Sequence, residues 1–241
     1  MSWRDESPAE RVIVALDCGR DEALDLAARL SGRAAWVKVG MTLFYAAGPK
    51  IVSQMHSLGF RVFVDLKLHD IPHQVRGAAA SLARAGADLM TVHAAGGEAM
   101  MAAAVEGARP FDAQGTDPAS RMAVCAVTVL TSMDAASLFA TGISDSPASQ
   151  VARLASLSRR AGVDGVVCSP MEAADMRALL GPDALVVTPG VRPAGSESAD
   201  QARTSTPAEA LAAGASHLVI GRPITAAADP QAAFDGIVSS L

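Results

Sequence analysis

The sequence predicts an α/β protein of the TIM (β/α)8 barrel class, and three observations lead to this prediction. Eight short runs rich in aliphatic and β-branched residues alternate with segments long enough to form helices. The length of 241 residues and the hydrophobic content of 50% suffice for one barrel with a large core. No linker or shift in composition divides the chain, so residues 1–241 are expected to form a single domain, with residues 1–10 as an N-terminal extension.

Each predicted strand is a run of β-forming residues bounded by segments of helical or turn character. In chain order the eight runs are RVIVALD (11–17), AAWVKVG (34–40), RVFVDLKL (61–68), DLMTVHA (88–94), RMAVCAVTVL (121–130), DGVVCS (164–169), ALVVTPG (184–190) and SHLVIG (216–221). Eightfold alternation of strand and helix favours a parallel sheet closed into a barrel. An open doubly wound sheet is the alternative, although no GxGxxG motif follows the first run.

A weak internal repeat supports the same division into strand-helix units. The repeat reads AGAD at 85–88, AGVD at 161–164 and AGAS at 213–216. Each copy precedes a predicted strand, as do Gly59 and Gly181, and glycine readily adopts the left-handed conformation that ends many helices. Two stretches rich in Gly, Pro, Ser and Asp interrupt the rhythm at 108–120 and 192–206, and the second is long enough for an active-site lid.

The composition argues against several classes of protein. A net charge of -5 disfavours a general nucleic-acid-binding surface, which needs broad Lys and Arg patches. No apolar stretch reaches the roughly 18 residues of a membrane span, and the polar start MSWRDESPAE does not resemble a secretory signal, so we expect a cytoplasmic protein. The three cysteines, Cys18, Cys125 and Cys168, show no metal-binding spacing and are expected to be buried, reduced thiols.

Side-chain alternation along the first three strands predicts a cluster of charges inside the barrel. The aliphatic residues of one parity should face the helices: Val12, Val14, Leu16, Val37, Val39, Val62, Val64, Leu66 and Leu68. The other parity places Asp17, Lys38, Asp65 and Lys67 inward, near the strand ends where barrel enzymes carry their active sites. A buried ion-pair network adds little stability, so a functional site is a better interpretation than inert scaffolding.

Two further residues lie near this cluster in the sequence pattern. His93, at the end of the fourth strand, faces inward by the same alternation and is expected to support the site rather than react. Asp70 lies beyond the third strand in a turn closed by Pro72, so alternation does not fix its direction.

The order and spacing of seven motifs resemble the orotidine 5'-phosphate decarboxylase family over nearly the whole chain. The motifs are VALD, VKVG, DLKLHDIP, TVHAAGG, VTVLTS, TPGVRP and VIGRPIT, of which DLKLHDIP is the most specific. The resemblance implies decarboxylation of orotidine 5'-phosphate to UMP and CO2 in pyrimidine biosynthesis, with no cofactor or metal. It further implies a catalytic charge array of Lys38, Asp65, Lys67 and Asp70, in which Lys67 protonates C6 of the pyrimidine.

The same resemblance implies a homodimer whose subunits complete each other's active sites through Asp70 and Ile71. The substrate-binding set that it implies is Asp17, Lys38, Ile71, Thr131, Pro189, Arg192, Gln201, Gly221 and Arg222. Of these, Gln201 matches the glutamine of the family's lid. This chain departs from many members at His73 and Gln74, where they carry Asn-Thr, so the ribose contact of that threonine hydroxyl is not carried over.

The residue types suit this chemistry. Loss of CO2 leaves an electron pair on C6, where no ring carbonyl is placed to accept it. A lysine between carboxylates keeps its ammonium proton and can deliver it to that carbon, whereas a Schiff base would need a neutral, desolvated lysine.

Three alternative functions remain at this point. A related sugar-phosphate decarboxylase or aldolase, for example one acting on a 3-keto sugar acid phosphate, would share the phosphate loops but need a divalent metal. An isomerase of the ribulose-phosphate epimerase type needs metal-binding His and Asp side chains at several strand ends, and only His93 is a plausible member. A catalytically inactive phosphate-binding module is the third, although every charge that decarboxylation demands is present.

Overall fold

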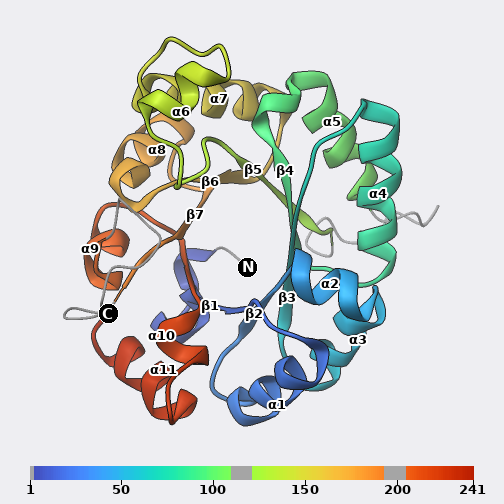
Figure 1. Ribbon diagram of the computed structural model, residues 1–241, viewed down its shortest axis with the longest axis vertical. Coiled ribbons are helices and arrows are strands. Elements are labelled where there is room, and N and C mark those ends of the chain that lie inside the picture. The colour runs from blue at the N-terminus through green and yellow to red at the C-terminus, as the bar shows by residue number, and fades with distance from the viewer. Residues whose placement is uncertain (1–2, 110–120, 193–204) are drawn as a thin grey trace.

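The eight predicted strands form a closed parallel barrel in the computed structural model, which describes residues 3–109, 121–192 and 205–241 (Figure 1). The strands are β1 Val12–Leu16, β2 Trp36–Gly40, β3 Arg61–Leu68, β4 Leu89–His93, β5 Ala123–Val127, β6 Gly165–Val167, β7 Leu185–Pro189 and β8 His217–Ile220. Neighbouring strands pair in sequence order, and β8 pairs with β1 through Val12–Leu218 and Val14–Ile220. This closing contact confirms the barrel and excludes the open doubly wound sheet.

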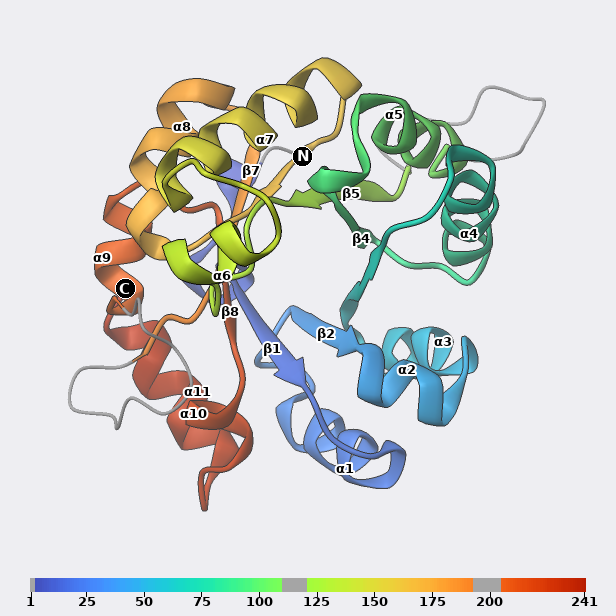
Figure 2. The same cartoon turned by 45° about the horizontal axis from the view of Figure 1, so that its top comes forward.

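Helices surround the strands on the outside of the barrel (Figures 1 and 2). The α-helices are α1 Arg20–Leu30, α2 Met41–Ala47, α3 Lys50–Ser57, α4 Pro72–Arg84, α5 Glu98–Gly107, α6 Ala135–Ala140, α7 Pro147–Ala161, α8 Ala173–Leu180, α9 Pro207–Ala212, α10 Arg222–Thr225 and α11 Pro230–Ser239. Short 3-10 helices add η1 Trp3–Asp5, η2 Pro8–Arg11, η3 Ala94–Gly96 and η5 Pro170–Glu172. Within the described ranges, no helix combines the length and apolarity needed to cross a membrane.

The observed strands agree with the predicted runs in order and differ mainly at their ends. The third run, 61–68, coincides with β3, whereas the fifth, predicted as 121–130, shortens to Ala123–Val127. The fifth strand ends early because the chain turns: the carbonyl of Leu130 accepts the amide of Met133 at 2.9 Å. The predicted glycine helix ends are also confirmed, since Gly162 follows α7 at φ 76° and accommodates the left-handed turn.

The hydrophobic core has two parts, separated by the barrel wall. Val12, Val14 and Leu16 of β1 pack outward against the helices, with the corresponding residues of β2 and β3. The interior is filled by a smaller cluster of Ile13, Ala15, Trp36, Phe63, Leu89, Cys125, Val187 and Val219. This division confirms the predicted alternation. It also places an apolar layer of side chains inside the barrel, beneath the charged residues at the strand ends.

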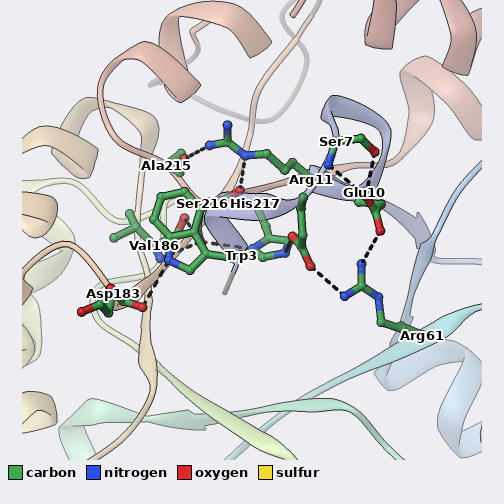
Figure 3. A network of polar contacts seen from close by, with 11 residues as sticks. Trp3, Ser7, Glu10, Arg11, Arg61, Asp183, Val186, Ala215, Ser216 and His217 are labelled. Atoms are coloured by element: carbon green, nitrogen blue, oxygen red, sulfur yellow. Dashed lines mark hydrogen bonds and ion pairs between the residues drawn. The ribbon is translucent and has the colours of Figure 1, made fainter. Parts of the chain in front are cut away.

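The N-terminal residues cover the opposite end of the barrel, where the strands begin (Figure 3). Glu6 Oε1 accepts a hydrogen bond from Arg61 Nη1 at 2.7 Å, and Glu6 Oε2 lies 2.9 Å from Nε2 of His217. Trp3 donates its indole N–H to the carbonyl of Asp183 at 3.2 Å, and the guanidinium of Arg177 lies 4.7 Å from its ring centroid. The described part of the predicted extension, residues 3–10, therefore forms a floor that connects the starts of several strands.

Candidate active site

A row of alternating charges lies where β1, β2 and β3 end. Lys38 Nζ donates a hydrogen bond to Asp17 Oδ1 at 2.7 Å and lies 3.6 Å from Asp65 Oδ2. Lys67 Nζ donates to the same Asp65 oxygen at 2.9 Å. The structure thus brings together the four residues that alternation assigned to the interior, and each ammonium faces a carboxylate. The side chains of Lys38 and Asp65 are only 9% and 12% exposed, so solvent screens this pair weakly.

The two ammonium groups keep Asp65 ionised despite its position. Burial alone disfavours the carboxylate, but the charges of Lys38 and Lys67 and the hydrogen bonds from Lys67 and Thr91 outweigh it. The pKa of Asp65 therefore lies below its ordinary value. The site holds a fixed negative charge at its centre throughout the neutral range.

Lys67 reaches this position through an irregularity in β3. Val64 pairs with Met90 and Leu68 with Val92, so β3 advances four residues while β4 advances two. Within this bulge Lys67 has φ 52°, and among the described residues it alone occupies positive φ without being glycine. A left-handed conformation costs a non-glycine residue about 1–2 kcal/mol, and such strain gathers at functional sites. Simple alternation therefore predicted the face of Lys67 but not the backbone that carries it.

Two residues that the sequence did not single out support the array. Thr91 accepts the amide of Lys67 at 2.9 Å and donates its hydroxyl to Asp65 Oδ1 at 2.9 Å. Gly40 ends β2 at a point where an added Cβ would lie 2.7 Å from Asp17 Oδ1 and 2.9 Å from Lys38 Nζ. The only sequence signals were the inward parity of Thr91 and the glycine that ends VKVG, and both become meaningful once the neighbouring strands are in register.

His93 ends β4 beside the array, as alternation predicted. Its ring centroid lies 5.5 Å from that of His69. Burial, together with the nearby positive charges of His69 and Lys67, lowers the pKa of His93 below its ordinary value. These surroundings favour the neutral form of His93.

The charge array forms one wall of a cavity of about 700 Å³ at the C-terminal mouth of the barrel. Its lining includes Asp17, Lys38, Asp65, Lys67, Thr131, Pro189, Arg192, Gly221 and Arg222, all of which the sequence assigned to the site. Cys18 and Glu22 also line the cavity and were not predicted. Cys18 is half-buried, and burial together with the nearby carboxylates of Glu22 and Asp17 raises its pKa to about 11, so its thiol stays protonated.

Two expected site residues lie outside this cavity. Asp70 is exposed, and its Oδ1 accepts the amide of Ile71 at 2.6 Å at the start of α4. Ile71 exposes 63% of its surface, which is high for a large aliphatic residue. His73 and Gln74 follow in the first turn of α4, also exposed. Gln201 and most of the predicted lid fall outside the described residues.

The chain is similar to known proteins over nearly its whole length. The model of the Orotidine 5'-phosphate decarboxylase / HUMPS family matches residues 10–237. A relative from Cutibacterium acnes, named orotidine 5'-phosphate decarboxylase, is 50% identical over 229 residues, covering 94% of each chain. A relative of the same name from Moorella thermoacetica is 51% identical over 239 residues, covering 96% of this chain and 92% of its own.

Solved structures extend the likeness to three dimensions. The crystal structure of orotidine 5'-phosphate decarboxylase from Lactobacillus acidophilus superposes with a TM-score of 0.81 and 38% identity, covering 95% of this chain and 98% of its own. A conserved, uncharacterized protein from Geobacillus kaustophilus gives the same TM-score at 42% identity, covering 94% and 97% of the two chains. The match over almost the entire length confirms the resemblance drawn from the motifs: the chain belongs to the orotidine 5'-phosphate decarboxylase / HUMPS family.

Proposed function

We propose that the chain, acting as a single barrel domain, decarboxylates orotidine 5'-phosphate to UMP and CO2 in pyrimidine biosynthesis without a cofactor. The observation that carries the proposal is the ammonium of Lys67, held 2.9 Å from Asp65 in the wall of a cavity that also contains Arg222. The names of the curated relatives, at about half identity over nearly the full length, point to the same reaction.

Lys67 is the proton donor in this proposal. At an effective dielectric near 20, opposite charges 2.9 Å apart attract by about 6 kcal/mol before desolvation is counted, which favours the ammonium form. When the bond between C6 and the carboxylate carbon breaks, the electron pair stays on C6 and takes the proton from Nζ. Lys67 then regains a proton from solvent, and UMP and CO2 leave.

The neighbouring groups complete the reaction. Asp65 crowds the departing carboxylate and keeps Lys67 charged, so it disfavours the bound substrate relative to the transition state. Lys38 and Asp17 hold the ribose hydroxyls and keep the array in order. In the segments that follow β7 and β8, Arg192, Arg222 and the Gly221 amide bind the phosphate, as in other phosphate-binding barrels.

The remaining residues of the predicted site contact the pyrimidine base or belong to the lid. Thr131 hydrogen-bonds the pyrimidine and Pro189 lines its pocket, since both border the same cavity as Lys67. Gln201 closes over phosphate and base, which converts remote binding into orientation and exclusion of water at C6.

We also propose a homodimer in which Asp70 and Ile71 enter the partner's active site. Support comes from their exposure outside this chain's own cavity and from the apolar surfaces of Met41 and Tyr45 on α2, which are 48% and 75% exposed. Co-refolding equal amounts of the inactive Asp70→Ala and Lys67→Ala variants tests this arrangement. Random pairing creates one intact site in each mixed dimer and restores about a quarter of the wild-type activity. No recovery in a mixture shown to contain mixed dimers contradicts shared sites.

The central experiment follows pyrimidine absorbance after orotidine 5'-phosphate is added to wild-type, Lys67→Ala and Lys50→Ala proteins. Lys50, an exposed residue at the start of α3, is the matched control. We expect Lys67→Ala to lose turnover by at least about 10⁴-fold while still binding UMP, and Lys50→Ala to match the wild type. Near-normal turnover by Lys67→Ala contradicts the mechanism.

Metal removal separates the proposed reaction from its nearest rival. Turnover of orotidine 5'-phosphate that survives EDTA supports the cofactor-free decarboxylation. Inactivity on this substrate, combined with metal-dependent decarboxylation of a 3-keto sugar acid phosphate, would identify the rival instead.

A further inference from the structure

Thr91 is a buried polar residue at the contact between β4 and the bulge of β3. Its surface is 1% exposed, and it points into the barrel between Leu89 and His93 on the same strand. Thr91 does not border the active-site cavity, so a bound substrate does not touch it. Any influence on the reaction must therefore pass through neighbouring groups.

The hydroxyl of Thr91 connects two parts of the charge array, and the direction of both hydrogen bonds is fixed. The amide of Lys67 can only donate, so Thr91 Oγ1 accepts this bond at 2.9 Å. The single hydroxyl proton is then free to point to Asp65 Oδ1, also at 2.9 Å. One oxygen atom thus touches the backbone of the proposed proton donor and the carboxylate that holds its side chain.

This contact divides the oxygens of Asp65 between two tasks. Oδ1 is occupied by the hydroxyl of Thr91, and Oδ2 faces Lys67 Nζ at 2.9 Å and Lys38 Nζ at 3.6 Å. The hydroxyl therefore fixes the rotation of the carboxylate, with one oxygen presented to both ammonium groups.

The same hydroxyl stabilises the unusual backbone of Lys67. Two extra residues of β3 lie opposite the step from Met90 to Val92, and within them Lys67 has φ 52°. A residue in this conformation persists only where its surroundings hold it, and the amide of Lys67 uses the hydroxyl of Thr91 as its acceptor.

We propose that Thr91 is a positioning residue for catalysis: its hydroxyl holds the bulge that carries Lys67 and turns Asp65 toward the two ammonium groups. The inference rests on the proposed function, because Lys67 is the proton donor only in that reaction. The charged and titratable groups that face Asp65 are Lys38 from β2, Lys67 from β3 and His93 from β4, and the test replaces none of them.

Three variants test the role of the hydroxyl. Thr91→Val removes it with little change of shape, Thr91→Ser keeps it, and Thr128→Val removes another buried hydroxyl that donates to the carbonyl of Val167 at 3.1 Å. We expect Thr91→Val to lose about 10²-fold in kcat, with KM within about twofold of wild type because the phosphate and ribose contacts remain. Thr91→Ser and Thr128→Val should keep kcat within about threefold of wild type.

The pH profile of kcat distinguishes positioning from simple structural support. Loss of the hydrogen bond to Asp65 raises the pKa of that carboxyl, so the acid limb of Thr91→Val moves to higher pH, while that of Thr128→Val stays. A lower Tm of Thr91→Val with unchanged kcat and an unchanged acid limb would overturn the proposal. If Thr91→Val does not fold, Thr91→Ala replaces it in the same measurements.

Crystal structures separate a failure of this inference from a failure of the proposed function. If wild-type protein does not convert orotidine 5'-phosphate, the proposed function is wrong, and the structures then decide the role of Thr91 alone. A displaced Asp65 carboxylate or a changed φ of Lys67 in the variant supports positioning. An Asp65–Lys67 contact and a Lys67 φ unchanged from wild type refute it.

Discussion

The N-terminal floor of the barrel depends on the carboxylate of Glu6, so Glu6→Gln is a sharp test of its contribution to stability. The side chain of Glu6 is 9% exposed, and its two oxygens face Arg61 and His217. Burial disfavours the carboxylate, but the contacts with His217 and Arg61 outweigh it, and the pKa of Glu6 lies below its ordinary value. Glutamine has the same shape as glutamate but carries no charge. Its amide N–H group would face the N–H group of either Arg61 or His217.

The size of the effect follows from the burial of Glu6 and His217, whose side chains are 9% and 4% exposed, whereas Arg61 is 38% exposed and its attraction to Glu6 is partly screened by solvent. Removing one member of a fully buried ion pair costs about 3–5 kcal/mol, and the remaining amide oxygen of glutamine recovers part of this through one neutral hydrogen bond. We therefore expect Glu6→Gln to lower the free energy of unfolding by about 2 kcal/mol. For a chain of this size that corresponds to a fall in Tm of roughly 4–8 °C.

Urea denaturation at pH 7 measures the free energy of unfolding of the wild type and of Glu6→Gln. The Glu10→Gln variant is the control. Glu10 lies 3.8 Å from the other terminal nitrogen of Arg61 but is 43% exposed, and glutamine preserves its capping contact with Ser7. An exposed pair of this kind contributes about 0–1 kcal/mol. Equal stabilities of the Glu6→Gln and Glu10→Gln variants would refute the reasoning.

The effect of Glu6→Gln should also depend on pH. Because the folded-state pKa of Glu6 lies below the ordinary value of 4.5, its contribution is complete well above pH 4.5. It disappears as the pH falls through the folded-state pKa, where the wild-type carboxyl also becomes neutral. A difference between wild type and variant that persists in full below that pH contradicts a charge-based contribution.

Three further predictions concern backbone positions. Gly40→Ala should lower turnover about tenfold or more with little change in Tm, because its Cβ would lie 2.7 Å from the Asp17 carboxylate; steady-state kinetics and thermal melting check both. Lys67→Gly should be more stable to urea than Lys67→Ala by about 1 kcal/mol, since φ is 52° at this site. Gly165→Ala should lose about 3 kcal/mol or more, because its Cβ would lie 2.0 Å from a backbone carbonyl oxygen of β7, whereas Gly236→Ala meets open space and should keep full stability.

The order of the elements and the direction of most side chains could be predicted because both follow from local periodicity. Alternation placed Lys38 and Asp65 correctly, since β2 and the first part of β3 are regular strands, and it also holds for Asp17, one residue beyond the end of β1. The barrel closure followed from the number of strand-helix units, which is a property of the whole chain rather than of any single contact.

The features that escaped prediction depend on neighbours distant in sequence. The bulge at Lys67 exists only in relation to the register of β4, and no glycine marks it in the sequence. The role of Glu6 depends on residues 55 and 211 positions further along the chain. The direction of Asp70 depends on a turn, and its proposed task depends on a second subunit, which no pattern within one chain encodes.

The floor also imposes an order of events during synthesis. Arg11 donates hydrogen bonds to the carbonyls of Ala215 and Ser216, residues more than 200 positions later, and Glu6 requires His217. Glu6 and Arg11 therefore remain without these partners until residues 215–217 have been translated. Strand β8 pairs with β1 and also provides His217 for Glu6. Barrel closure and the docking of the N-terminal floor therefore occur together, once β8 has formed.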